Sequence, residues 1–402
     1  MDANDRAIAG FTAISHLMFH VYELAIPLFV VIWLDVFAVS PAVLGTIVGA
    51  GYGLIGVGAM LSGALSDVYG SKTLVLASMV GMGGGFLLMS AWPSVVTVAL
   101  GILAWGAGAS LYHPAGLSLL TRGSKERGTA LAYHGAAGNV GTAVGPFLAA
   151  LLLTFVGWRL AAGLFVLPAV VGVLVGLRFE FDETAAVDAT IDGGATVDLG
   201  GLARQSKALF TGGFVIAFAV MMAHGVYSRG VLSFLPEILA DLPLFRPVAL
   251  FDRSFEPSQY VYAGLLLLGG GGQYLGGRLT DRTATEPLLI GSYAALVAVS
   301  VLFVPASAAG LVPLLAVCGA LGFLIYMTAP IRQALVATYA DADVHGLSFG
   351  YTYLGVYGVG ALGPSLAGLA LTHATTEVFF LLFAGVAATV ILLGVVLLVR
   401  EW

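Results

Sequence analysis

The chain contains Gly63-Ala64-Leu65-Ser66-Asp67, and 214 residues later it contains the related stretch Gly277-Arg278-Leu279-Thr280-Asp281. Spacings of 214 or 218 residues also separate Tyr112 from Tyr326, Tyr133 from Tyr351, and Gly145-Pro146 from Gly363-Pro364. A repeat at a nearly constant offset predicts two halves with the same architecture in the same orientation.

The composition is that of a membrane protein. Hydrophobic residues make up 59% of the 402 positions and charged residues 9%, with a mean hydropathy of +1.00. A soluble domain usually has about a quarter of its residues charged. This chain has too few charges to cover a soluble globule, so its exterior is expected to face lipid.

Twelve apolar stretches are each long enough to cross the hydrocarbon core, which takes about 20 residues. They cover 9–35, 41–64, 73–91, 94–121, 128–155, 158–178, 209–239, 257–279, 287–304, 309–336, 346–372 and 376–399. With the repeat, they predict an all-α integral membrane protein with twelve transmembrane helices in two pseudo-symmetric six-helix halves. The expected divisions are 1–178, an acidic cytoplasmic linker at 179–208, and 209–402.

The basic residues predict the orientation, because cytoplasmic loops carry an excess of Lys and Arg. If both termini are cytoplasmic, the outer loops hold only Arg159, Arg246 and Arg253. The inner loops and span ends then hold twelve basic residues: Arg6, Lys72, Arg122, Lys125, Arg127, Arg178, Arg204, Lys207, Arg278, Arg282, Arg332 and Arg400. We therefore expect a multi-pass protein of the cell membrane with both termini inside.

The loop Gly63-Ala-Leu-Ser-Asp67-Val-Tyr-Gly70-Ser-Lys72 resembles the hallmark loop of the major facilitator superfamily. That resemblance implies the major facilitator fold, alternating access and function as a monomer. It also implies that Gly63, Asp67, Gly70 and Lys72 latch one state, with Asp67 facing the positive end of a neighbouring helix. Asp281 and Arg282 take this role in the second copy, whereas Val68 replaces the usual Arg in the first.

A second set of motifs resembles the fosmidomycin-resistance-type exporters. It comprises Tyr112-His113-Pro114, Gly138-Asn139-Val-Gly141 with Gly145-Pro146, and Phe234-Leu235-Pro236. The resemblance implies export of a drug-like or anionic compound. The fourth span has no Arg at mid-depth, where many drug–proton antiporters have one.

Ionisable side chains inside a span are costly and indicate function by default. Glu23 lies near the middle of the first span, and His16, His20 and Glu23 share one helix face by their spacing of four and three. Desolvation there favours the neutral acid, so Glu23 is predicted to exchange a coupling proton. The alternative is a permanent structural pair with Arg229.

Arg229 lies within the seventh span, near the expected depth of Glu23. Its guanidinium suits a carboxylate or phosphate group. Arg229 is therefore predicted either to contact substrate or gate the pathway, or to be fixed to Glu23.

Five histidines lie at span depth, and a histidine is suited to relaying protons. His20 and His224 correspond in the repeat and join Glu23 as predicted proton-coupling residues. His113 and His134 are expected to approach each other on adjacent helices and to contact substrate or a gate. Packing is the alternative for each, and no metal site is expected.

The remaining candidates are polar or repeat-related residues at span depth. Arg332 is expected to snorkel or gate, with substrate binding as the alternative. Substrate contacts are predicted for Tyr112, Tyr326, Tyr133, Tyr351 and Asn139. The pairs Gly145-Pro146 and Gly363-Pro364 are expected to bend the fifth and eleventh spans where the halves meet.

These patterns predict a secondary active transporter that exports a small organic solute, drug-like or anionic, in exchange for protons. The alternatives are uptake or facilitated diffusion of a metabolite without proton coupling, and a receptor of the same fold. The sequence has no phosphate-binding loop of the ATPase type and no hydrolase motif. We expect no enzymatic activity, no cofactor and no nucleic-acid partner.

Overall fold

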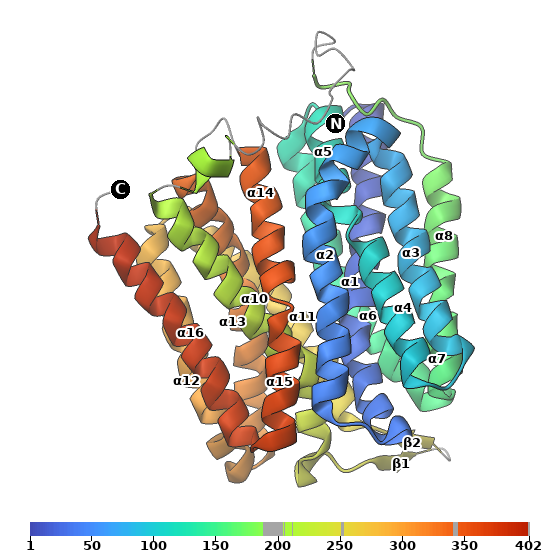
Figure 1. The fold of residues 1–402 in the computed structure, drawn as a ribbon, viewed down its shortest axis with the longest axis vertical. Coiled ribbons are helices and arrows are strands. Elements are labelled where there is room, and N and C mark those ends of the chain that lie inside the picture. The colour runs from blue at the N-terminus through green and yellow to red at the C-terminus, as the bar shows by residue number, and fades with distance from the viewer. Residues whose placement is uncertain (188–203, 205, 211, 251–252, 341–344, 401–402) are drawn as a thin grey trace.

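The computed structural model describes residues 1–187, 204, 206–210, 212–250, 253–340 and 345–400, and most of them are helical (Figure 1). The first half comprises α1 (Ala3–Phe37), α2 (Pro41–Tyr69), α3 (Ser71–Ala91), α4 (Val95–Ala109), α5 (Tyr112–Gly123), α6 (Arg127–Phe155), α7 (Trp158–Leu164) and α8 (Val166–Leu177). The second comprises α10 (Gly213–Ala240), α11 (Pro257–Thr280), α12 (Thr285–Ala309), α13 (Leu311–Tyr339), α14 (His345–Tyr353), the π-helix η3 (Leu354–Val359), α15 (Leu362–His373) and α16 (Thr376–Val399).

Each of the twelve predicted spans coincides with helical segments of the structure. Within the described residues, eleven are long and apolar enough to cross a membrane, with α4 and α5 forming one and α7 and α8 another. The remaining predicted span, 257–279, is helix α11, which has 24 residues but is less apolar than those eleven. At 1.5 Å per residue its length is about 36 Å, enough to cross the hydrocarbon core.

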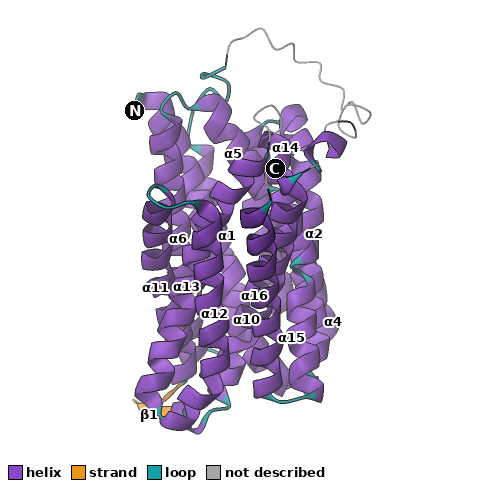
Figure 2. Ribbon diagram, turned by 90° about the vertical axis from the view of Figure 1, so that its left-hand side faces the viewer, coloured by secondary structure: helices purple, strands orange, loops and turns teal. Residues whose placement is uncertain are grey.

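The helices pack as two groups in sequence order, α1–α8 and α10–α16 (Figures 1 and 2). Helix α1 begins and α16 ends at the same end of the bundle, which we call the termini end. The short strands β1 (Val248–Leu250) and β2 (Arg253–Phe255) pair antiparallel at the opposite, far end. The groups meet where α2 packs on α15 and η3, α6 on α11, and α1 on α10. This is the all-α arrangement that the repeat predicts.

The far end is closed between the halves. The backbone N–H of Ala42 donates to the Thr372 hydroxyl at 3.0 Å, and the Thr154 and Tyr260 hydroxyls lie 3.1 Å apart. The backbone of Gly45 lies directly against the Pro364 carbonyl, so a Cβ at Gly45 would overlap it. The two halves are therefore in direct contact at the far end, through these hydrogen bonds and this close backbone approach.

Candidate functional site

An ion pair joins the halves at mid-depth. Arg229 of α10 donates from Nη1 to Oε1 of Glu23 on α1, and the Glu23 side chain is 1% exposed. Helices α1 and α10 pack against each other at the boundary of the two halves, which brings the residues together. The predicted pairing is thus present in this conformation, whereas its role as a gate or a fixed pair stays a prediction.

Two tyrosines flank the guanidinium of Arg229. Its Cζ atom lies 5.0 Å from the ring centre of Tyr52 on α2 and 4.2 Å from that of Tyr357 in η3. Cation–π attraction of this kind gains strength where water is excluded. Arg229 is therefore held by aromatic rings of both halves as well as by Glu23. Tyr52 and Tyr357 were not identified from the sequence. The only feature that could have marked them is that each is a tyrosine within a predicted span.

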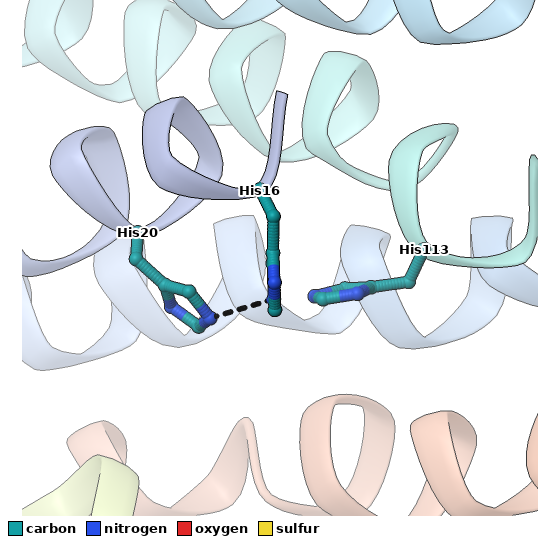
Figure 3. Close-up of side chains that lie close together, drawn as sticks. All are labelled: His16, His20 and His113. Atoms are coloured by element: carbon teal, nitrogen blue, oxygen red, sulfur yellow. Dashed lines mark hydrogen bonds between the residues drawn. The ribbon is translucent and has the colours of Figure 1, made fainter. Parts of the chain in front are cut away.

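Histidines extend the cluster from Glu23 toward the termini end. His20 Nδ1 lies 2.7 Å from the second Glu23 oxygen, and His20 Nε2 lies 3.1 Å from His16 Nε2 (Figure 3). His16 Nδ1 lies 2.8 Å from the backbone carbonyl of His134. The spacing along α1 thus produces the shared face of His16, His20 and Glu23 that the sequence predicts.

The hydrogen bonds determine how many protons this row of side chains carries. A carbonyl oxygen only accepts, so His16 Nδ1 holds the hydrogen and a neutral His16 accepts at Nε2. His20 Nε2 must then donate to His16. At its other nitrogen, His20 either donates to an ionised Glu23 or accepts from a protonated one. In both arrangements Glu23 and His20 together hold one dissociable proton.

His113 and His134 lie close together, as the sequence predicts, with His16 between them. Both contact His16, which lies between them: the His134 ring stacks on it at 4.0 Å, and the His113 ring meets its edge at 5.3 Å. His113 also stacks on Tyr353 of the second half at 4.7 Å. The first half therefore reaches the second through His113 as well as through Glu23.

Ring nitrogens of His16, His20 and His113 lie within 4.8 Å of one another (Figure 3). Three imidazoles are a donor set that zinc and similar cations use. The 3.1 Å separation of His16 and His20 is that of a hydrogen bond, in which His20 Nε2 donates to His16 Nε2 as described above. The expectation of no metal stays a prediction.

A pocket of about 590 Å³ opens at the termini end along α1 and α6. Its lining includes Arg6, Ala13 and Tyr133. Ala13 lies less than one helical turn before His16, and the His20 side chain is still 18% exposed, whereas Glu23 is buried. Exposure thus falls stepwise along α1 from the pocket to Glu23.

His224 and Arg332 lie outside the Glu23 cluster. His224 Nδ1 is 2.9 Å from the Tyr293 hydroxyl within the second half, so repeat symmetry does not bring it to Glu23. Arg332 is 8% exposed and donates from Nη1 to the sulfur of Met221 at 3.4 Å. The expectation that Arg332 snorkels is wrong, because its side chain turns into the helix bundle.

The other predicted substrate contacts are dispersed. Tyr112 is buried and donates to the Thr12 carbonyl at 2.9 Å. Tyr326 packs on Gly269, and the Tyr351 hydroxyl donates to Ser206 at 2.9 Å. Only Tyr133 lines the termini-end pocket, with Asn139 partly buried farther along the same helix. Their substrate roles stay predictions.

The loop at residues 63–72 contacts the first half and the start of the predicted linker. Asp67 accepts a hydrogen bond from Arg122 at 2.6 Å rather than facing a helix N-terminus. The carboxylate of Glu183 takes that place, accepting from the backbone N–H groups of Ser71 at 2.7 Å and Lys72 at 3.1 Å. Gly70 permits the turn with a φ of 81°. Gly63 faces open space, so it does not mediate a close helix approach here.

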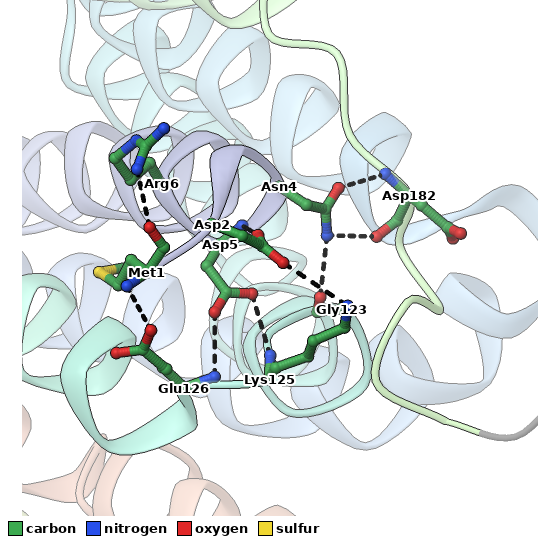
Figure 4. A network of polar contacts seen from close by, with 9 residues as sticks. All are labelled: Met1, Asp2, Asn4, Asp5, Arg6, Gly123, Lys125, Glu126 and Asp182. Carbon is green, nitrogen blue, oxygen red and sulfur yellow. Dashed lines mark hydrogen bonds and ion pairs between the residues drawn. The ribbon is translucent and has the colours of Figure 1, made fainter.

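The start of the predicted linker is attached to the same surface (Figure 4). Lys72 donates from Nζ to the Phe179 carbonyl at 2.5 Å, and Asn4 donates to the carbonyls of Gly123 and Asp182.

At the start of α1, the Asp2 carboxylate accepts from the backbone N–H of Asp5, and this bond lowers the pKa of Asp2. Most of 188–208 lies outside the described residues, and the three-part division stays a prediction. In the second copy, Asp281 and Arg282 are exposed after α11.

The two Gly-Pro pairs are placed differently: Gly145 packs within the first half, whereas the Pro364 carbonyl lies at the expected boundary between the halves, against Gly45. Helix α6 continues through Pro146, and Gly145 lies against the backbone of Val21 in the same half. Gly363 likewise lies against Val226 of its own half. The eleventh predicted span is instead interrupted at η3, before Gly363, and this π-helical turn carries Tyr357. The glycines thus allow close packing inside each half.

Comparison with known proteins agrees with this architecture. Residues 11–364 match the sequence model of the Major Facilitator Superfamily. An uncharacterised MFS-type transporter of Bacillus subtilis (strain 168), YfnC, is 25% identical over 333 residues, which are 81% of this chain and 76% of the relative.

Three solved transporter structures are also similar. A mutant of the nucleoside transporter NupG has a TM-score of 0.75 at 14% identity, covering 97% of this chain and 99% of its own. A mutant of the peptide transporter POT has a TM-score of 0.73 at 13% identity, and the match covers 97% of this chain and 93% of that transporter. A D-xylose–proton symporter has a TM-score of 0.73 at 15% identity, and the match covers 97% of each chain. At these identities the likeness shows the fold alone.

Proposed function

Because the chain belongs to the Major Facilitator Superfamily and is a multi-pass membrane transporter of that type, we propose that it exports a small organic solute in exchange for protons. It acts as a monomer in the cell membrane with both termini in the cytoplasm, and its solute is of the drug-like or anionic kind moved by fosmidomycin-resistance-type exporters. The observation that carries the proposal is the Glu23 carboxylate, shared between Arg229 of the opposite half and His20.

Protonation of Glu23 supplies the switch. An ionised Glu23 attracts Arg229 and holds the halves together at mid-depth, whereas a protonated Glu23 loses most of that attraction. Alternating access requires the halves to rock about their interface. A proton on Glu23 therefore weakens the contact across which the halves move.

His20 and His16 supply the route for the proton. The Glu23–His20–His16 row of hydrogen bonds runs toward the pocket at the termini end, which we take as cytoplasmic. The far end is closed in this conformation. The proton on Glu23 and His20 is thus released toward the cytoplasm, as proton-driven export requires.

The same ion pair also favours a second candidate, uptake of an anion together with a proton. Protonation of Glu23 frees Arg229, which can then bind an anion that moves in the same direction as the proton. The direction in which solute moves under an imposed pH gradient separates the two candidates.

The test is proton movement in proteoliposomes that contain a pH-sensitive dye, screened against organic anions, drugs and sugars. We expect at least one compound to move protons through the wild type and through Glu256→Gln, whose carboxylate lies in the far-end loop. The same compound should cross Glu23→Gln without a proton signal. A wild type that carries solute with no proton signal at any gradient contradicts the proposal.

A further inference from the structure

Arg332 differs from Arg229 in having no counter-charge. Arg229 has a carboxylate and two aromatic faces, whereas Arg332 donates to the weakly accepting sulfur of Met221. The Arg332 Nε atom is buried without a hydrogen-bond partner, and no carboxylate of the described chain pairs with its guanidinium. With 8% exposure, this is a buried and uncompensated cation.

An uncompensated charge inside a membrane span destabilises the protein, and such residues mark ligand or ion pathways. Arginine stays protonated in proteins, so Arg332 cannot relieve the cost by losing its proton. An anion bound beside it would remove that cost. The position is therefore one where a ligand, rather than a side chain, is expected to supply the negative charge.

Further buried donors without a partner lie elsewhere in the second half, around Arg229. They include the Nε atom of Arg229 and the hydroxyl of Tyr262. His224 lies within electrostatic reach of both guanidinium groups. A neutral imidazole and a tyrosine hydroxyl can each donate to an oxygen-rich ligand. The second half thus presents a surplus of donors at the centre of the bundle.

Arg332 is also within reach of the termini end. It lies seven residues before the end of α13 at Tyr339, or about 10 Å at 1.5 Å per residue. His224 lies deeper, eleven residues after α10 begins at Gly213, or about 16 Å. Measured along the helices, Arg332 therefore lies closer to the termini end than His224 and Arg229 do.

We propose that Arg332 binds the anionic group of the transported solute, and that the solute class is an organic anion with a carboxylate or phosphonate group. This inference rests on the proposed transport function but not on proton coupling. Arg229 keeps its carboxylate partner and acts at the gate, while Arg332 selects for charge. The proton route then runs along α1 of the first half and the anion site lies in the second.

The test uses the full-length purified chain in lipid nanodiscs, without any gradient. The probes are two matched pairs, benzoate with benzamide and phenylphosphonate with benzyl alcohol, and the readouts are affinity and the shift in Tm. Charge-assisted hydrogen bonds predict at least about tenfold weaker anion binding in Arg332→Gln, with part of the affinity regained in Arg332→Lys. Arg159→Gln, at an exposed far-end position, should bind as the wild type does.

Stability without ligand separates binding from a structural role. If Arg332 is an anion-binding residue that is unpaired without ligand, Arg332→Gln removes an unpaired buried charge. The Tm of the Arg332→Gln variant without ligand should then equal or exceed that of the wild type. Glu23→Gln should retain anion binding even though proton coupling is lost, so the two proposals fail separately. The inference is wrong if neither anion binds the wild type, if the neutral partners bind equally well, or if Arg332→Gln keeps anion affinity within twofold.

Discussion

Glu23 of α1 and Arg229 of α10 form an ion pair across the boundary between the two halves, at a depth where water is largely excluded. The two residues are 206 residues apart, which is close to the 204-residue offset that relates His20 to His224 in the repeat, so each lies at a similar depth of its own half. The pair holds the halves together at mid-depth while Tyr52 and Tyr357 fix the guanidinium. Most of the expectations below follow from this arrangement.

Removal of one member of the pair should destabilise the protein more than removal of both. Glu23→Gln leaves Arg229 without its carboxylate, and Arg229→Gln leaves Glu23 with His20 but without its permanent counter-charge; breaking a buried pair costs about 3–5 kcal/mol in soluble proteins. The double substitution Glu23→Gln with Arg229→Gln leaves no buried charge at that point. We expect its Tm in nanodiscs to lie above those of both single variants. Additive losses would show that the two side chains do not interact.

His16 should control how fast protons reach Glu23. His16 accepts the hydrogen bond from His20 on the side of the termini-end pocket, whereas His224 is bound to Tyr293 elsewhere. We expect His16→Gln to slow the dye response in proteoliposomes several-fold and His224→Gln to leave it close to the wild-type rate. Equal rates in the two variants would remove His16 from the proton route.

The glycines of α2 should set the closure of the far end. A Cβ at Gly45 meets the Pro364 carbonyl, whereas a Cβ at Gly63 on the same helix meets nothing within 4 Å. Gly45→Ala should therefore favour the conformation that is open at the far end. The measurement is the rate at which a cysteine at Thr372, in a Cys318→Ala background, reacts with a membrane-impermeant reagent. We expect several-fold faster labelling with Gly45→Ala and no change with Gly63→Ala. Labelling that is equally fast in both variants would mean that this contact does not hold the far end closed.

The Glu183 carboxylate should stabilise the start of α3. It accepts from the backbone N–H groups of Ser71 and Lys72, and loss of a helix cap costs about 0.5–2 kcal/mol. Glu183→Ala should lower the Tm and speed proteolysis between residues 179 and 187. Glu180→Ala, at an exposed position of the same segment, is the matched control. Unchanged proteolysis in Glu183→Ala would show that the cap does not hold the segment in place.

The sequence predicted the helices well because the thickness of the hydrocarbon core sets the length of each apolar stretch that crosses it. The repeat likewise predicted two halves, and the 3.6-residue period placed His16, His20 and Glu23 on one face. These properties depend on local spacing. They require no knowledge of how one helix rotates against another.

The errors concern contacts between helices. His224 corresponds to His20 in the repeat, but its Nδ1 atom lies 2.9 Å from the Tyr293 hydroxyl and not in the Glu23 cluster. Asp67 was expected at a helix N-terminus, which Glu183 from the predicted linker occupies instead. The aromatic pair around Arg229 comes from α2 and η3, and no spacing within either segment could reveal it.

The most direct test of proton coupling compares two kinds of transport in Glu23→Gln proteoliposomes, once the dye screen has identified a solute. One is exchange of labelled for unlabelled solute at equal pH, and the other is accumulation driven by an imposed pH gradient. Because Glu23 carries the proton and not the solute, exchange should remain near the wild-type rate while driven accumulation disappears. Accumulation at the wild-type level would contradict the coupling role of Glu23, and loss of both kinds of transport would make Glu23 a structural partner of Arg229.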